Sequence, residues 1–211
     1  MDITFEREYK GNSILTNKEN QQGCRTDILD KMKSVIDHTT QKHNNVLCSR
    51  LDLRYPKDYN GPKNNKDIQV FMSKFIKYFK RNGYDPHYLW VREQSKEKHQ
   101  HYHLMIAVNG NKMQFPHQLR KKAAEHWAST VKSDQQGLVC HCDRSRQGDF
   151  QHSSYRLRRN APDFDQVYDD CHKRCSYLAK ENTKGYAPKR HREFGYSRIP
   201  KSIDLKNRNG C

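Results

Sequence analysis

The stretch HYHLMIAV, residues 101–108, decides how this sequence folds. Side chains alternate along a strand, so His101 and His103 point to one face and the tyrosine between them points to the other. The abrupt switch to the apolar LMIAV predicts a strand that is buried over most of its length. This strand is predicted at residues 101–109. A second alternating run at residues 87–93, separated from it by the polar SKEKHQ, completes a predicted β-hairpin.

Regular patterns continue outward from this hairpin in both directions. A hairpin in the middle of alternating strands and helices cannot belong to an all-parallel sheet. The predicted fold class is therefore α+β, with a central antiparallel sheet whose helices pack on one face and leave the other face for a site. The flanking predicted elements are a helix of about residues 25–42, a strand at 46–55 ended by Pro56, a helix with apolar residues from Ile68 to Phe79, a helix at 116–131, a strand around 138–142 and a helix of about 162–180.

The charge balance indicates a polyanionic partner. Forty Lys and Arg stand against 24 Asp and Glu, which gives a net charge of +16 and a pI near 9.6. Nucleic acid fits this balance, whereas no long amphipathic helix is left over for a membrane surface. The sequence shows no signal peptide and no apolar run long enough to span a membrane, so we expect a cytoplasmic protein of the bacterial host.

The seven cysteines are odd in number and scattered, which excludes a complete disulfide framework and indicates reduced thiols. Cys140 with Cys142 and Cys171 with Cys175 form two pairs. Together they offer the ligands of a four-thiolate zinc site, or they are ordinary buried cysteines of a core.

The two histidines of the hairpin are candidate metal ligands. Imidazoles two residues apart on a strand, about 7 Å at Cα, can converge on one ion. If the hairpin turn centres near residue 97, Glu93 lies directly opposite His101 and supplies a third ligand, although a slip of one residue would turn it away. His99 shares the face but lies about 13 Å from His103 along an extended strand. The alternative is a merely polar strand edge.

Tyr177 and Lys180 are the candidate catalytic pair. They lie three residues apart in HKRCSYLAKENTKGY, residues 172–186, so on a helix they share a face and can address one phosphate. Only about one phenol in a thousand is ionised at pH 7, a deficit of about 4 kcal/mol that a metal or an ammonium must offset. The alternative is an amphipathic helix with a half-buried tyrosine. Tyr168 and Tyr186 lack a lysine three residues later within a clear helical segment.

Basic residues in two regions are candidate DNA ligands. Arg50 and Arg54 lie on the strand face opposite Leu51 and Leu53, close to the predicted site. The segment from Lys184 to Arg208 carries eight Lys or Arg with interleaved aromatic residues, which suits a chain that tracks a nucleic-acid backbone, or a solvated terminus. Its candidate DNA-binding residues are Lys184, Lys189, Arg190 and Arg192.

Three segments together resemble a known class of proteins. LDLRYP at 51–56, HYHLMIAV at 101–108 and YLAK at 177–180 match, in order, the three motifs of the HUH endonucleases, which include rolling-circle replication initiators and relaxases. More narrowly, WVREQ, HYH and CSYLAKENTK resemble the YagK/YfjJ family of prophage proteins, related to the replication initiators of filamentous phages. The likeness spans residues 46–198.

This resemblance implies a sheet of about five antiparallel strands, with the metal on its open face. His101 and His103 would be metal ligands, Tyr177 the nucleophile and Lys180 its electrostatic helper, with Mg²⁺ or Mn²⁺ as the expected ion. Tyrosine attack on single-stranded DNA would leave a 5′-phosphotyrosine link and a free 3′-hydroxyl, so that the strand can be rejoined. The implied organisation is an N-terminal segment and helix at 1–45, a nuclease domain at 46–198 and a basic tail at 199–211.

Two departures narrow the implied function. Lys173 stands four residues before Tyr177, where some members of the superfamily carry a second tyrosine, so only single-tyrosine chemistry is supported. The chain has no GxxxxGK[ST] loop, so unwinding would come from a host helicase, beside a host polymerase. The implied substrate is single-stranded DNA or an origin-like hairpin. Two alternatives stay open, a non-catalytic DNA-binding prophage regulator and an RNA-binding module on a similar sheet.

Overall fold

The fold is a central antiparallel sheet with helices against it. The computed structural model describes residues 2–61, 63–94, 99–145, 147–181 and 190–200. Its elements are short strands β1 (Ile3–Thr4), β2 (Glu8–Tyr9), β3 (Asn12–Ser13) and β4 (Cys24–Arg25); sheet strands β5 (Asn45–Leu53), β6 (His87–Glu93), β7 (His101–Asn109), β8 (Val139–Cys140), β9 (Ser154–Arg158) and β10 (Phe194–Tyr196); helices α1 (Thr26–Lys42), α2 (Lys66–Arg81), α3 (Pro116–Val131) and α4 (Phe164–Cys175); and the 3₁₀ helix η1 (Ser176–Ala179).

The main sheet has six strands and every pairing in it is antiparallel. Its order is β10-β6-β7-β5-β8, and β9 pairs with the first half of β5. The predicted hairpin is confirmed as β6 and β7, with Glu93 directly opposite His101. On the other side of β7, Asp52 of β5 lies opposite His103. The α+β class with an antiparallel sheet is therefore confirmed.

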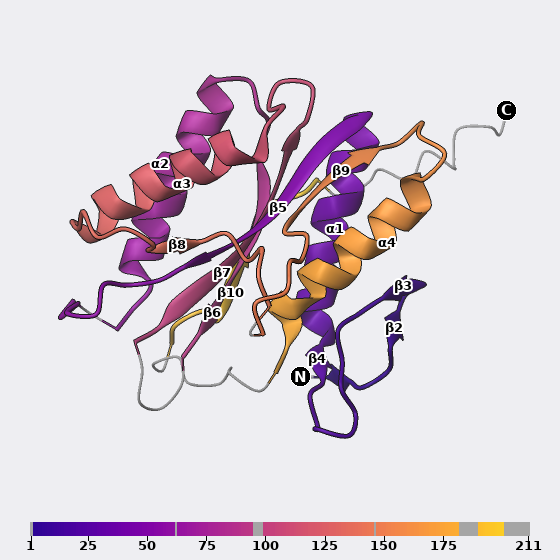
Figure 1. Ribbon diagram of the computed structural model, residues 1–211, viewed down its shortest axis with the longest axis horizontal. Helices are drawn as coiled ribbons and strands as arrows, with labels where there is room; N and C mark the ends of the chain where they lie inside the picture. The colour runs from indigo at the N-terminus through magenta and orange to yellow at the C-terminus, as the bar shows by residue number, and fades with distance from the viewer. Residues whose placement is uncertain (1, 62, 95–98, 146, 182–189, 201–211) are drawn as a thin grey trace, which may run out of the picture.

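Helices cover both faces of the sheet, so the prediction of helices on one face only was wrong. Figure 1 shows α2 and α3 on one side of the sheet and α1 and α4 on the other. The reason lies in β5 and β7, whose central residues are buried on both faces. An apolar residue at every position, as in LMIAV, needs cover on both sides of the sheet.

The face under α2 and α3 is a closed aromatic core. Phe71, Phe75 and Phe79 recur every fourth residue along α2. The rings of Phe71 and Phe75 stack at a centroid distance of 5.0 Å, and the ring of Phe79 is tilted against Phe75 at 4.5 Å. Trp127 of α3 packs edge-on against Phe71, and its indole N–H donates to the backbone oxygen of Arg54 at 2.6 Å. These side chains are fully buried, so each removes a large apolar area from water.

The face under α1 and α4 is apolar over one part and ionisable over the rest. The apolar part contacts the two helices through residues such as Cys48, Val91 and Met105. Beyond them, the next positions on the same face of β5, β6 and β7 are ionisable. These positions are Arg50, Asp52, Glu93, His101 and His103.

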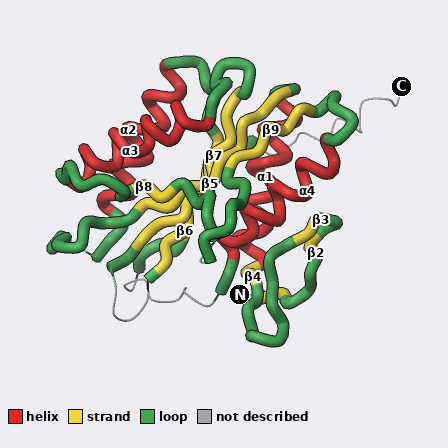
Figure 2. The backbone as a smooth tube through the Cα atoms, viewed as in Figure 1, coloured by secondary structure: helices red, strands yellow, loops and turns green. Residues whose placement is uncertain are grey.

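Several elements differ from the sequence expectations. The short strands β1 to β4 and the sheet strands β9 and β10 were not predicted, and the predicted helix at 162–180 is divided into α4 and η1. β10 forms the edge of the sheet beside β6, where a Cβ on Gly195 would come within 2.6 Å of the Trp90 ring, so only glycine fits. Figure 2 shows the loop-rich N-terminal segment beside α4, against which β3 packs. Among the described helices, none is both long and apolar enough to cross a membrane.

Candidate metal and tyrosine site

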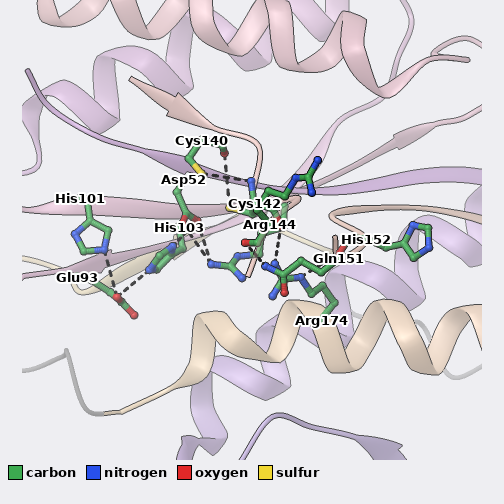
Figure 3. A network of polar contacts seen from close by, with 11 residues as sticks. Asp52, Glu93, His101, His103, Cys140, Cys142, Arg144, Gln151, His152 and Arg174 are labelled. Carbon is green, nitrogen blue, oxygen red and sulfur yellow. Dashed lines mark hydrogen bonds and ion pairs between the residues drawn. The ribbon is translucent and has the colours of Figure 1, made fainter. Parts of the chain in front are cut away.

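Glu93, His101 and His103 converge at the ends of β6 and β7. Nε2 of His103 and Nε2 of His101 lie 2.8 and 3.3 Å from the same oxygen of Glu93. Glu93 and His103 are buried, whereas the imidazole of His101 is one-third exposed (33%). Figure 3 shows Glu93 between the two histidines. The hairpin register creates this cluster, because it places the carboxylate opposite one histidine and diagonal to the other.

Asp52 orients His103 and was missed by the sequence reasoning. Its carboxylate lies 2.5 Å from Nδ1 of His103, so Nδ1–H donates to it and Nε2 is left facing Glu93. Burial alone would raise the pKa of Asp52, but His103 and then Arg50 hold it well below its usual value. Burial disfavours the imidazolium, yet Asp52 outweighs it and raises the pKa of His103.

The cluster fits a divalent ion. One carboxylate oxygen and two imidazole nitrogens lie within 4.8 Å of one another, which is the donor set that Mn²⁺, Zn²⁺ and related ions accept. Nε2 of His103 is buried and lies 2.8 Å from the carboxylate of Glu93, so both groups can bind one ion. The carboxylate behind Nδ1 is the arrangement that fixes ring orientation in metal-bound histidines. An ion would displace the proton that His103 otherwise holds.

Tyr177 lies against this cluster. It belongs to η1, directly after α4, and its ring packs edge-on to the ring of His103 at a centroid distance of 5.3 Å. The guanidinium of Arg50 lies 3.9 Å above the tyrosine ring, and Nζ of Lys180 lies 5.0 Å from its centroid. Lys180 directly follows the last residue of η1, and its contact with the ring puts the two side chains on one side. The tyrosine therefore has two cations and the candidate ligands around it.

The N-terminal segment holds η1 in place. Lys180 forms a β-bridge with Cys24, and the backbone N–H of Glu181 donates to the oxygen of Gly23 at 3.0 Å. Ser176 accepts a hydrogen bond from the backbone N–H of Leu15 at 2.7 Å. Residues before α1 thus position the tyrosine, although they lie far from it in the sequence.

The cluster and Tyr177 line one cleft with a volume of about 1130 Å³. Seven Lys or Arg line it against two carboxylates, Asp52 and Glu93. Cys140 also lines it, and a hydrogen bond from the Cys142 thiol lowers the pKa of Cys140 to about 5. Figure 3 shows the polar network continuing from Asp52 toward α4. The seven cations are Arg50, Arg54, Lys57, Lys63, Arg144, Arg174 and Lys180.

The candidate DNA-binding residues are divided between two places. Arg54 is exposed at the cleft, whereas Arg50 is buried (4% exposed) against Tyr177 and its guanidinium contacts Asp52. Arg190 and Arg192 line a different pocket, of about 760 Å³, between α2 and β10. Sequence reasoning could not separate them, because the division depends on where β10 joins the sheet. Lys184, Lys189 and residues 201–211 of the predicted tail lie outside the described residues.

The two predicted cysteine pairs do not form one site. Cys140 and Cys142 lie at the cleft, where the guanidinium of Arg174 donates to the backbone oxygen of Cys142 at 2.7 Å. Cys171 and Cys175 lie in the core and gather with Cys48 of β5. The strand thiol was missed because its neighbours depend on how α4 packs on the sheet.

The fold and the site define an α+β protein with a Glu/His/His cluster and a tyrosine in one basic cleft. The chain belongs to the YagK/YfjJ C-terminal domain family, whose model matches residues 5–197. It is also similar to the uncharacterized protein YfjJ of Escherichia coli (strain K12), with 28% identity over 200 residues, covering 80% of this chain and 92% of YfjJ. The family match begins well before β5 and includes the N-terminal segment that braces η1.

Proposed function

We propose that this protein is an HUH-type endonuclease that nicks and rejoins single-stranded DNA through a covalent 5′-phosphotyrosine intermediate. The observation that carries the proposal is the contact between the Tyr177 ring and His103, inside a cleft that also holds Glu93 and His101. Phosphoryl transfer to a tyrosine requires a nucleophile, a set of metal ligands and cations within one cleft.

Tyr177 is the proposed nucleophile. Its phenol oxygen attacks the scissile phosphorus, the bond from phosphorus to the 3′ oxygen breaks, and that oxygen leaves as the 3′-hydroxyl after taking up a proton. The phosphate stays on the tyrosine and on the 5′ end of the downstream strand. The cations of Arg50 and Lys180 beside the ring favour the negative charge that the phenol oxygen gains as it loses its proton.

Glu93, His101 and His103 would hold the ion, and Asp52 would keep Nε2 of His103 directed at it. A bound Mg²⁺ or Mn²⁺ would polarise the scissile phosphate and offset its charge. The two histidines together with a carboxylate favour Mn²⁺ among the commonly available ions, with Mg²⁺ as the abundant substitute.

The proposed substrate is a single strand or an origin-like hairpin with a single-stranded segment. The cleft offers cations such as Arg54 and Lys57 to a phosphate backbone. The phosphotyrosine link keeps the energy of the broken bond, so a 3′-hydroxyl can later attack it and restore the strand. We place this reaction in rolling-circle replication of a phage or prophage element, in the bacterial cytoplasm, with a host helicase and polymerase.

The test is a search for the covalent adduct. Single-stranded oligonucleotides tiled across the element that encodes this chain are incubated with protein and Mn²⁺, and adducts are mapped by mass spectrometry. We expect an adduct on Tyr177 that is absent in Tyr177→Phe and without metal. Tyr168→Phe is the matched control, because Tyr168 lies on α4 with its hydroxyl directed at Asp37, away from the cleft.

Three outcomes would replace the proposal. An equal adduct in Tyr177→Phe would assign the chemistry to another residue. Binding of the same oligonucleotides without any adduct would favour a non-catalytic DNA-binding regulator, and preferential, chelator-insensitive binding of RNA would favour an RNA-binding module.

A further inference from the structure

Three cysteines meet beneath the tyrosine, in a place that the proposed nicking reaction does not use. Cys171 and Cys175 lie one turn apart on α4 and face Cys48 on β5. Their sulfur atoms all lie within 4.8 Å of one another. All three side chains are fully buried or nearly so (at most 2% exposed).

The sulfur atoms contact one another as well as apolar neighbours. Hydrogen bonds from the Cys171 and Cys48 thiols hold the pKa of Cys175 well below its usual value. The same sharing raises the pKa of Cys171, because a thiolate there would lose its bond to Cys175. A cation between the three sulfur atoms would favour the thiolate form of each cysteine that binds it.

Charge balance also favours a cation at this position. Three thiolates around a divalent ion leave one negative charge, and two around a monovalent ion leave the same. The buried guanidinium of Arg50 acts on Cys175 electrostatically and offsets that charge. Buried charges are tolerated when such a partner is present.

We propose that Cys48, Cys171 and Cys175 form a site for one thiophilic d¹⁰ cation, Cu(I) or Zn(II), distinct from the Glu93, His101 and His103 cluster. Each cysteine that ligates the ion releases its thiol proton, and no oxidation is involved. The donors differ in kind from those of the cluster, because cysteine thiolates are softer ligands than carboxylate and imidazole. Among the described residues, no fourth Cys, His, Asp or Glu joins the group.

Such an ion would fasten the tyrosine segment to the sheet. Cys175 is the last residue of α4, two residues before Tyr177, and Cys48 lies two residues before Arg50 on β5. A bound ion would thus fix the distance between the strand that carries Arg50 and Asp52 and the helix that carries the tyrosine. The binding itself does not rest on the nicking reaction.

The test is metal binding by the full chain, purified under reducing, oxygen-free conditions. Cu(I) and Zn(II) are added separately, and Cd(II) serves as a spectroscopic probe because thiolate ligation gives charge-transfer absorption in the near ultraviolet. We expect the wild type to bind one equivalent of metal through sulfur. Competition with a chelator then ranks the affinities for Cu(I) and Zn(II). Cys171→Ser and Cys48→Ala should lose the absorption and weaken binding at least about 100-fold.

Two controls separate this site from the rest of the chain. The double variant Cys140→Ser, Cys142→Ser removes two other thiols and should retain the absorption. His101→Ala removes a candidate ligand of the other cluster and should also retain it. Circular dichroism of each variant reports folding, and the wild-type measurement stands whatever the variants do. No charge-transfer absorption in the wild type, or its survival in Cys171→Ser, would overturn the proposal.

Discussion

The two faces of the sheet are built from the same strands but carry different chemistry. On the face under α2 and α3, the inward residues of β5 and β7 are apolar apart from Ser49, and aromatic side chains such as Phe75 and Trp127 close the core. On the opposite face the inward residues are apolar only as far as α1 and α4 cover them, and then become Arg50, Asp52 and His103. The site therefore lies on the part of this sheet face that α1 and α4 do not cover.

This difference separates stability from activity. Asp52 and His103 are buried ionisable groups that are paired with each other, and such pairs contribute little net stability because desolvation offsets their attraction. The aromatic face contributes through area removed from water, which is the dominant favourable contribution to folding. We expect substitutions on the face under α2 and α3 to change the free energy of unfolding. Substitutions at the site should change metal binding and the proposed nicking.

The largest expected effect on stability is a cavity in the aromatic face. Phe75→Ala removes a fully buried ring that packs against Phe71 and Phe79, and should cost about 3–5 kcal/mol of unfolding free energy in urea. Val70→Ala on the exposed side of the same helix should cost about 1 kcal/mol or less. At a temperature where Phe75→Ala is folded, its metal affinity should equal that of the wild type; a loss there would show that the faces are not independent.

The apolar half of the second face holds an imidazole, His87, whose pKa burial lowers to about 4 despite Asp85 nearby. The unfolded chain takes up this proton near pH 6.5, so stability is full above about pH 6.5 and falls as the pH drops toward 4. The expected loss is about 3 kcal/mol over that range. His87→Phe should remove this part of the pH dependence, and the exposed His117→Gln should leave it; unfolding curves at pH 7 and 4.5 decide between them.

A smaller effect, on metal affinity, is expected at Asp52, where the apolar part of the face under α1 and α4 meets its ionisable part. Asp52→Asn keeps the shape of the side chain but no longer fixes the Nδ1 proton of His103, so Mn²⁺ affinity should fall about 10–100-fold by calorimetry. Asp85→Asn, which alters another Asp–His pair at His43, should not change it. Unchanged Mn²⁺ affinity in Asp52→Asn would mean that the ion, if bound, does not use His103.

The smallest expected effect is at the edge of the cleft. Lys180→Met removes a cation near the Tyr177 ring and should slow nicking by about tenfold while Mn²⁺ affinity stays unchanged. Lys173→Met, four residues before the tyrosine and exposed, is the matched control. Equal rates for Lys180→Met and the wild type would leave Arg50 as the cation that assists the tyrosine.

Elements with strong periodicity were predicted with the same bounds as in the structure, namely 87–93, 101–109 and 116–131. β9 and β10 were not, because strands of five and three residues form through their partners and leave little periodic signal of their own. The second helical layer was also missed, although an apolar residue at each position of LMIAV requires cover on both faces. Local pattern does not show which surfaces meet.

The residues of the candidate site also differ in whether the sequence could predict them. Glu93 followed from one assumption about a local turn, since its partner lies in the next strand of a hairpin. Asp52 could not follow, because its pairing with His103 joins strands about fifty residues apart and depends on their register. Likewise the contact of Arg50 with Tyr177 and the gathering of Cys48 with α4 arise only from tertiary packing.

The central place of β5 sets the order in which the protein can assemble. This strand is made early, but its partners β7, β8 and β9 leave the ribosome about 50 to 110 residues later, roughly 3–20 s at ordinary elongation rates. Until then the apolar residues of β5 have no strand partners, and such long-range pairing forms slowly. The tyrosine segment and β10 come later in the chain than these strands. The proposed nicking site can therefore form only after all the strands that pair with β5 have been made.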